Sequence, residues 1–197
     1  MFLSNLRHFD LHLNPSDFGG NPHDDEYMRF VEMLNNGLLH SYAQPIVDLY
    51  TGQVFGYELL ARGIEPFFSP AELFQKAQQW GLEWEVEYAC RIAALKQFAE
   101  SSKQMPRANF FINISPETFS TPEFQSAFSM ERLQEYGISG ERLILEITET
   151  ASVDDYSRFE DTIRNYVQQG FRIALDDFGS GHSGLITLAA TTPHILK

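Results

Sequence analysis

Four short apolar runs in this chain each lead into a side chain with an oxygen donor. Short apolar runs bounded by turn residues are typical of buried strands. One polar residue at the end of such a run is weak evidence, but four at similar positions point to a shared site. The runs and the residues that follow them are 54–57 with Glu58, 109–112 with Asn113, 143–145 with Glu146, and 171–175 with Asp176 and Asp177.

Strand periodicity predicts which of these side chains share a face. Side chains alternate faces along a strand, so Phe111 lies on the side of Asn113, Ile144 on that of Glu146, and Ala174 on that of Asp176. In a parallel barrel, the C-terminal strand ends converge on one site. Carboxylates gathered there are costly without a cation, and Mg²⁺, Mn²⁺ and Ca²⁺ prefer hard oxygen ligands. The pattern therefore indicates a divalent metal site. For residues 176–181 alone, an acidic turn is the alternative.

The order of elements favours an α/β fold. Residues 1–23 carry turn and breaker residues and predict an irregular leader, and residues 24–197 form the predicted barrel-like domain. Alternating strands and helices imply a parallel sheet, closed or doubly wound. The pattern gives about six strands, whereas a complete TIM barrel has eight. The expected elements are helix 24–36, an antiparallel hairpin of strands 42–49 and 53–61, helices 70–80 and 82–101, strand 109–114, helix 122–136, strand 142–148, helix 154–169, strand 171–176, helix 182–190 and a strand from 194.

Composition narrows the function classes. The formal net charge of −13 argues against a basic face for nucleic-acid polymers or anionic membranes. A small anionic ligand remains compatible if metal ions bridge it to the protein. The single cysteine, Cys90, cannot form an internal disulfide, which fits a reducing compartment, and we expect a buried structural thiol. No apolar run reaches the roughly 18 residues that span a bilayer. We therefore expect a cytoplasmic location, with a tether elsewhere in a longer gene product left open.

Five motifs in order make the chain resemble the EAL domain of bacterial cyclic-di-GMP phosphodiesterases. The resemblance extends from about residue 27 to the end, with Leu59 replacing the eponymous alanine of the family. The chain also has the family's opening strand at residues 42–49, and Lys197 falls where the family has a lysine after its sixth strand. The motifs are Gly56-Tyr57-Glu58-Leu59-Leu60-Ala61-Arg62, Ser69-Pro70-Ala71-Glu72-Leu73-Phe74, Asn113-Ile114-Ser115-Pro116, Glu146-Ile147-Thr148-Glu149 and Asp176-Asp177-Phe178-Gly179-Ser180-Gly181.

This resemblance implies a TIM-like (β/α) barrel of the EAL type, incomplete and with an antiparallel first strand. It also implies hydrolysis of one phosphodiester of cyclic-di-GMP to the linear dinucleotide, with a two-metal site of Mg²⁺ or Mn²⁺. The resemblance implies that the metal ligands are Glu58, Asn113, Glu146, Asp176 and Asp177. It implies that the contacts to cyclic-di-GMP are made by Gln44, Leu60, Arg62 and Ser183, with Arg62 on a phosphate. It also implies catalytic support by Glu149, which holds the loop 177–183, and by Lys197, which lies near the metal and the attacking water.

The residues also leave other interpretations open. The family's general-base glutamate and further acidic residues lie downstream of Lys197, so we expect the isolated chain to be inactive or nearly so. The serious alternative to an enzyme is a cyclic-di-GMP receptor or a protein-docking EAL domain. A third interpretation is a fragment that covers its open sheet edge by forming a homodimer. A protein kinase, suggested by Asp177-Phe178-Gly179, is rejected because the chain has neither a glycine-rich phosphate loop nor a His-Arg-Asp loop.

Overall fold

The computed structural model describes residues 11–115, 119, 121–122, 128–135, 140–148, 156–177 and 184–197. These residues form one six-stranded sheet with the strands in chain order, and no pairing among them joins the first strand to the last. This open sheet with its parallel strands confirms the α/β expectation and the count of about six. The strands are β1 (His40–Val47), β2 (Val54–Arg62), β3 (Asn109–Asn113), β4 (Leu143–Thr148), β5 (Arg172–Asp176) and β6 (Ile195–Leu196).

The strands from β3 to β6 are all parallel, and their register sets the site. Asn113 of β3 lies opposite Glu146 of β4, and Glu146 lies opposite Ala174 of β5. Ala174 in turn pairs with Ile195 of β6. This register carries the polar residues at the strand ends to the same edge of the sheet.

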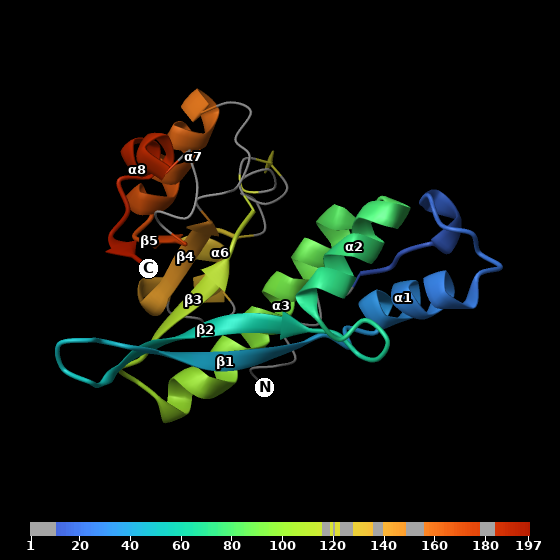
Figure 1. Cartoon of the computed structure of the whole chain (residues 1–197), viewed down its shortest axis with the longest axis horizontal. Helices are drawn as coiled ribbons and strands as arrows, with labels where there is room; N and C mark the ends of the chain where they lie inside the picture. The colour runs from blue at the N-terminus through green and yellow to red at the C-terminus, as the bar shows by residue number, and fades with distance from the viewer. Residues whose placement is uncertain are drawn as a thin grey trace. The chain divides into compact units, whose positions relative to one another are not determined.

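The connection between β1 and β2 is a short turn, so the two strands form the predicted hairpin (Figure 1). Asp48 shapes this turn because its carboxylate accepts hydrogen bonds from the backbone N–H groups of Tyr50 and Thr51 at 3.0 and 2.8 Å. The predicted strand 42–49 is therefore shifted: it begins at His40 and ends at Val47, where the turn begins.

The chain divides into two compact units, and the strands β1 and β2 contribute residues to both. Unit 1 comprises Met1–Gln44 and Leu59–Pro106, and unit 2 comprises Pro45–Glu58 and Arg107–Lys197. Unit 1 contains the helices α1 (Asp25–Asn35), α2 (Pro70–Trp80) and α3 (Glu83–Gln104) around a core rich in aromatic side chains. Asp24 is the N-cap of α1, and a capping box starts α2 at Ser69.

Residues 11–23, which belong to the predicted leader, are part of unit 1 and pack against α1. The segment includes a short 3₁₀ helix, η2 (Pro15–Asp17). The backbone N–H and C=O of Leu13 both bond to the side chain of Asn35, at 2.7 and 3.0 Å. The Tyr27 hydroxyl donates to the carbonyl of Pro15 at 2.7 Å. These contacts tie the segment to α1.

Unit 2 has a small apolar layer below the polar strand ends. Phe111, Ile144 and Ala174 form this buried layer, and Ile195 packs against it. These are the residues that strand periodicity placed on the face of Asn113, Glu146 and Asp176, so that prediction is confirmed. The described helices of unit 2 are α6 (Met130–Glu135), η3 (Gly140–Arg142), α7 (Tyr156–Gln168) and α8 (Gly184–Thr191).

Helices α7 and α8 pack against each other and against β5 (Figure 1). The predicted helix 122–136 is not continuous, because Phe128 and Ser129 are not helical and α6 begins only at Met130. Residues 123–127 and 136 of that prediction lie outside the described residues. Among the residues that the structure describes, no helix combines the length and the apolar character needed to cross a bilayer.

Candidate functional site

Three carboxylates of unit 2 surround one ammonium group. The Lys197 Nζ lies 2.9 Å from Glu58 Oε2 and 3.5 Å from Asp176 Oδ1. It also donates a hydrogen bond to Glu146 Oε1. The structure thus brings together four of the predicted site residues, which are up to 139 positions apart in the chain.

Strands of one sheet fix the positions of these side chains. Glu58 lies within β2, Glu146 within β4, and Asp176 ends β5. The backbone N–H of Lys197 donates to the carbonyl of Leu175 at 2.9 Å, which continues the β5–β6 ladder and directs Lys197 along the same sheet edge. The cluster is therefore held by backbone pairing and not by loops.

Glu146 is the most deeply buried member of the cluster. Its exposed fraction is 0%, whereas the side chains of Glu58 and Asp176 are 17% and 22% exposed. Burial raises the pKa of Glu146 to about 7, although the hydrogen bond from Lys197 opposes this shift. Burial lowers the pKa of Lys197, but the hydrogen bonds to Glu146 and Glu58 outweigh it, so the net pKa is raised and the group stays an ammonium.

The second carboxylate oxygen of Glu146 makes the donor set fit a cation. Among the described groups, Oε2 of Glu146 is buried without a hydrogen-bond partner. A buried carboxylate oxygen without a partner is costly, and a hard cation is one way to satisfy it. Three carboxylates and one ammonium also leave the cluster with excess negative charge.

Asn113 and Asp177 complete the predicted ligand set in different ways. The Asn113 amide nitrogen donates to Glu58 Oε1 at 3.0 Å, so Asn113 is joined to the cluster through Glu58. Asp177 is exposed, with φ at 54°, in the left-handed region that Asp tolerates better than most residues. Its ligand role stays a prediction.

The carboxylates are arranged around the ammonium and not around an ion-sized point. Among the described residues, no group of three or more His, Cys, Asp or Glu side chains is placed to hold a metal ion as it stands. The residue types fit Mg²⁺ or Mn²⁺, and the Lys197 Nζ occupies the point on which they converge. A metal site here therefore requires these side chains to regroup.

The remaining predicted site residues are not members of the cluster around Lys197. Gln44, Leu60 and Arg62 belong to unit 1. The Arg62 Nη1 donates to its neighbour's carbonyl, that of Ala61, at 2.7 Å, and the guanidinium lies 5.6 Å from the ring centroid of Tyr42. Glu149 and Ser183 fall outside the described residues, so their roles stay predictions.

Phe111 is a site residue that the motif pattern does not assign. Its ring centroid lies 5.6 Å from the Lys197 Nζ, within the range of a cation–π contact. Strand parity offers a clue, because it places Phe111 on the face of Asn113. The chemical role of the ring is evident only once Lys197 is positioned above it.

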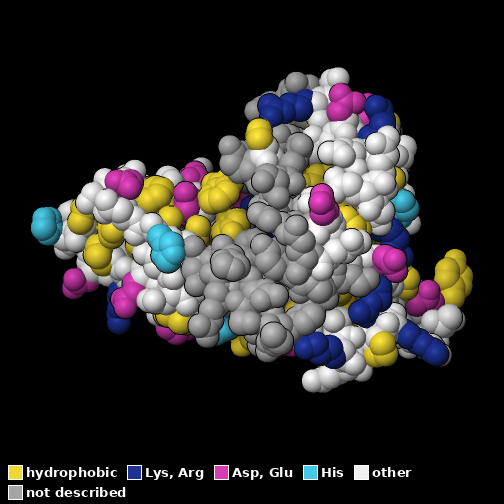
Figure 2. All heavy atoms as spheres, turned by 180° about the vertical axis from the view of Figure 1, so that it is seen from behind, with side chains coloured by type: hydrophobic (Ala, Val, Ile, Leu, Met, Phe, Trp, Pro, Cys, Tyr) yellow, Lys and Arg dark blue, Asp and Glu magenta, His cyan; other side chains and the backbone are white. Residues whose placement is uncertain are grey.

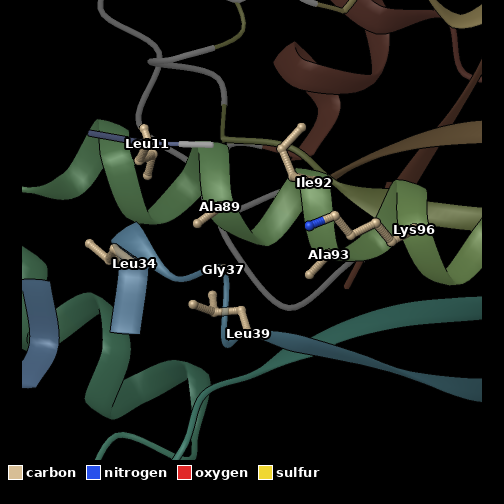
Figure 3. A pocket seen from close by; sticks show the side chains of 8 residues that line it. All are labelled: Leu11, Leu34, Gly37, Leu39, Ala89, Ile92, Ala93 and Lys96. Atoms are coloured by element: carbon tan, nitrogen blue, oxygen red, sulfur yellow. The ribbon is translucent and has the colours of Figure 1, made fainter. Parts of the chain in front are cut away.

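A separate hollow in unit 1 does not belong to this site (Figure 3). Its cavity volume is about 20 Å³, room for roughly one water molecule, so it is a packing gap and not a nucleotide site. Apolar side chains dominate its lining, and Lys96 is its one charged member. The lining residues are Leu11, Leu34, Gly37, Leu39, Ala89, Ile92, Ala93 and Lys96.

One face of the molecule carries charged side chains of both signs. Figure 2 shows one face, on which Asp and Glu side chains lie among the Lys and Arg side chains. This mixture agrees with the formal net charge of −13 and gives no support to a nucleic-acid polymer as partner.

Comparisons with known proteins agree on one family. The EAL domain family matches residues 28–197. A probable cyclic di-GMP phosphodiesterase, PdeI, of Escherichia coli is 31% identical over 167 residues, which cover 82% of this chain and 21% of PdeI. An uncharacterized signaling protein of Caulobacter vibrioides is 33% identical over 164 residues, or 79% of this chain and 19% of that protein. The chain thus spans about a fifth of these curated relatives.

Solved structures agree with the fold. The Bacillus subtilis YkuI protein, which has an EAL domain and was solved with substrate c-di-GMP and calcium, is 25% identical with a TM-score of 0.68. The match covers 94% of this chain and 44% of that chain. The sheet described above is therefore the EAL arrangement, in the form of an incomplete TIM-like barrel.

Proposed function

Because the chain belongs to the EAL domain family, we propose that it binds cyclic-di-GMP within a metal-dependent phosphodiesterase that forms the linear dinucleotide. The observation that carries this proposal is the gathering of Glu58, Glu146 and Asp176, from β2, β4 and β5 of one sheet, around the Lys197 ammonium. The names of PdeI and the ligands of YkuI support the choice of substrate class. A cytoplasmic location, where such a second messenger would be met, stays a prediction.

The proposed metal ligands each bring a defined chemistry. Glu146 offers a buried oxygen, and Glu58 and Asp176 offer oxygens from side chains that are only partly exposed. Asn113 would contribute its amide oxygen, which requires its present hydrogen bond to Glu58 to be exchanged. A bound pair of Mg²⁺ or Mn²⁺ ions, the second held partly by Asp177, would activate a water and stabilise charge on the attacked phosphate.

The ligand contacts rest on the family pattern together with local chemistry. Arg62 offers a guanidinium fork that suits a phosphate, and its stacking over Tyr42 limits the freedom of the side chain. Gln44 and Leu60 are proposed as further contacts, and Ser183 and Glu149 as contributors of the loop 177–183. The Lys197 ammonium would lie near the metal and the attacking water.

A receptor without hydrolysis is the second candidate. The observation that favours it is the Lys197 ammonium at the centre of the carboxylates, where it supplies positive charge without a metal ion. A receptor of this kind would bind cyclic-di-GMP in the presence of a chelator and release no linear product.

Isothermal titration calorimetry with cyclic-di-GMP separates these candidates. We expect binding in Mn²⁺ that weakens at least about tenfold, or about 1.4 kcal/mol, in chelator and in the Glu146→Gln variant. Glu141→Gln is the matched control, because Glu141 is an exposed glutamate of the same unit. Equal binding in chelator would favour the receptor, and no binding in either buffer would overturn both candidates.

Two further expectations belong to the same samples. We propose that the 197-residue chain alone releases little or no linear dinucleotide, and chromatography of the titrated samples measures this directly. Metal-dependent product would contradict it. We also propose a homodimer that covers an open sheet edge. Light scattering at micromolar concentration measures the oligomeric state, and a clean monomer would contradict the homodimer.

A further inference from the structure

The Lys197 ammonium is surrounded by the same oxygens that the proposed metal site requires. Its contacts are Glu58 Oε2 at 2.9 Å, Asp176 Oδ1 at 3.5 Å and Glu146 Oε1. The Lys197 side chain is only 18% exposed, and its Nζ lies 5.6 Å from the Phe111 ring centroid. Such a partly buried ammonium interacts strongly with its neighbours because solvent screens it little.

Charge balance explains why an ammonium is stable there. Three carboxylates on strands of one sheet would repel one another across a largely buried space, and their burial is costly without positive charge. One ammonium offsets a third of that charge and hydrogen-bonds two of the carboxylates. Oε2 of Glu146 still has no partner among the described groups, so the demand for positive charge is only partly met.

A divalent ion and the ammonium cannot both take the central position. An ion that uses Glu58 Oε2, Glu146 Oε1 and Asp176 Oδ1 needs the oxygens that now face Nζ. The described acidic side chains are not placed to hold an ion as they stand, which agrees with their grouping around a lysine. The two cations therefore compete for one set of ligands.

We infer that Lys197 is a built-in counter-cation, which holds Glu58, Glu146 and Asp176 together before a divalent ion binds and which that ion displaces. This inference rests on the proposed metal-binding function of the same site. Lys197 is then a positioning residue. A metal ion binds only the molecules in which the ammonium has left the carboxylates, so the fraction of such molecules sets the apparent metal affinity. Displacement then leaves the ammonium free to turn toward an anionic substrate.

The Lys197→Met variant tests the competition, since methionine keeps much of the apolar stem and removes the charge. In calorimetry with Mn²⁺ alone, we expect the variant to bind about tenfold more tightly than the unaltered chain. In chelator, we expect its melting temperature to fall by about 4 °C or more, because one partner of a buried ion pair is lost. Saturating Mn²⁺ should restore the melting temperature to at least that of the unaltered chain.

Lys96→Met is the matched control, because Lys96 lies in unit 1 beside the small hollow. We expect it to leave Mn²⁺ affinity unchanged. Unchanged or weaker Mn²⁺ binding by Lys197→Met would overturn the competition, and an unchanged melting temperature in chelator would overturn the counter-cation. Absence of Mn²⁺ binding to the unaltered chain would overturn the displacement. The proposed function is tested separately by the titration with cyclic-di-GMP, so its failure can be distinguished from failure of this inference.

A second measurement keeps the inference testable if Lys197→Met does not fold. The chain has four lysines, at positions 76, 96, 103 and 197. Nuclear magnetic resonance of the chain with labelled lysine side chains should therefore give four resolved signals. On addition of Mg²⁺ we expect the Lys197 signal to move and the Lys96 signal to stay. A Lys197 signal that does not respond to bound Mg²⁺ would overturn the displacement.

Discussion

Glu146 shows how far a single residue can be understood from its position in the sequence. A carboxylate after a short apolar run predicted a strand-end ligand, and the structure places it in the cluster around Lys197. Its complete burial and its unpartnered oxygen depend on β3, β5 and the layer below, which no local pattern reports. Lys197 was expected near a metal, whereas its contact with three carboxylates is a finding of the structure.

Cys90 gives a prediction at this scale. The residue is partly buried rather than fully buried as expected, and it packs against the core of unit 1. Desolvation of the thiol raises its pKa to about 12. Because the thiolate is the reactive form, we expect iodoacetamide at pH 8 to modify the folded chain at least about 100-fold more slowly than the chain in urea. Mass spectrometry of timed samples measures both rates. Similar rates in the two solvents would show that the thiol is accessible.

The sign of the linked stability effect follows from the same pKa. The folded-state value is above that of the unfolded chain, so the folded chain keeps its proton over a range where the unfolded chain loses it. The contribution of Cys90 to stability is therefore complete below about pH 9 and declines as the pH rises toward 12.

At the scale of elements, most boundaries followed from local chemistry. Helix α2 runs from Pro70 to Trp80 as predicted, because Ser69 caps its start and Gly81 adopts the left-handed conformation at its end. Helix α3 continues to Gln104, three residues past the predicted end at 101. It ends at Gln104, just before Met105 and Pro106, because the proline ring disfavours a helical conformation of the residue that precedes it.

Removal of the cap on α2 tests the first of these assignments. The Ser69 Oγ accepts a hydrogen bond from the Glu72 N–H at 3.2 Å, and Glu72 Oε2 accepts one from the Ser69 N–H at 2.8 Å. We expect Ser69→Ala to destabilise the fold by about 1 kcal/mol in urea denaturation, because alanine lacks the hydroxyl that accepts from the Glu72 N–H and donates to Glu72 Oε2. Ser69→Thr keeps the hydroxyl and should cost far less. Equal losses would exclude the cap as the cause.

Gly56 tests the packing between β2 and β3. A Cβ at this position would lie 2.7 Å from the carbonyl oxygen of Asn109 and 3.0 Å from Phe111 Cε2. We expect Gly56→Ala to lower stability by about 1–3 kcal/mol, since backbone cannot move aside as a flexible side chain can. Gln53→Ala, an exposed change beside β2, is the control. A Gly56→Ala chain as stable as the control would mean that the two strands separate easily.

At the scale of the whole molecule, each unit contains a hydrophobic cluster built from its own described residues. The helices α1 to α3 surround the larger one in unit 1, whereas the site and its apolar layer belong to unit 2. The residues of β2 belong to both units, with Glu58 in unit 2 and Arg62 in unit 1. A metal ion bound at the site should therefore stabilise unit 2 more than unit 1.

Hydrogen exchange with mass spectrometry tests this expectation. With saturating Mg²⁺, we expect amides in β3, β4 and β5 to exchange up to about 100-fold more slowly, because a ligand stabilises the unit that binds it. Amides in α1 and α3 should change little. Equal protection in all five elements would show that the units open together.

The sequence by itself determined the order of the elements, the faces of the strands and the residue types at the strand ends. These features follow from periodicity, turn residues and caps, which act over a few neighbouring positions. Only the tertiary structure decided that Lys197 meets Glu58, 139 positions away, and that one oxygen of Glu146 is left without a partner among the described groups. Such contacts depend on strand register and on the packing beneath it, because side chains far apart in the chain meet only when the sheet has formed.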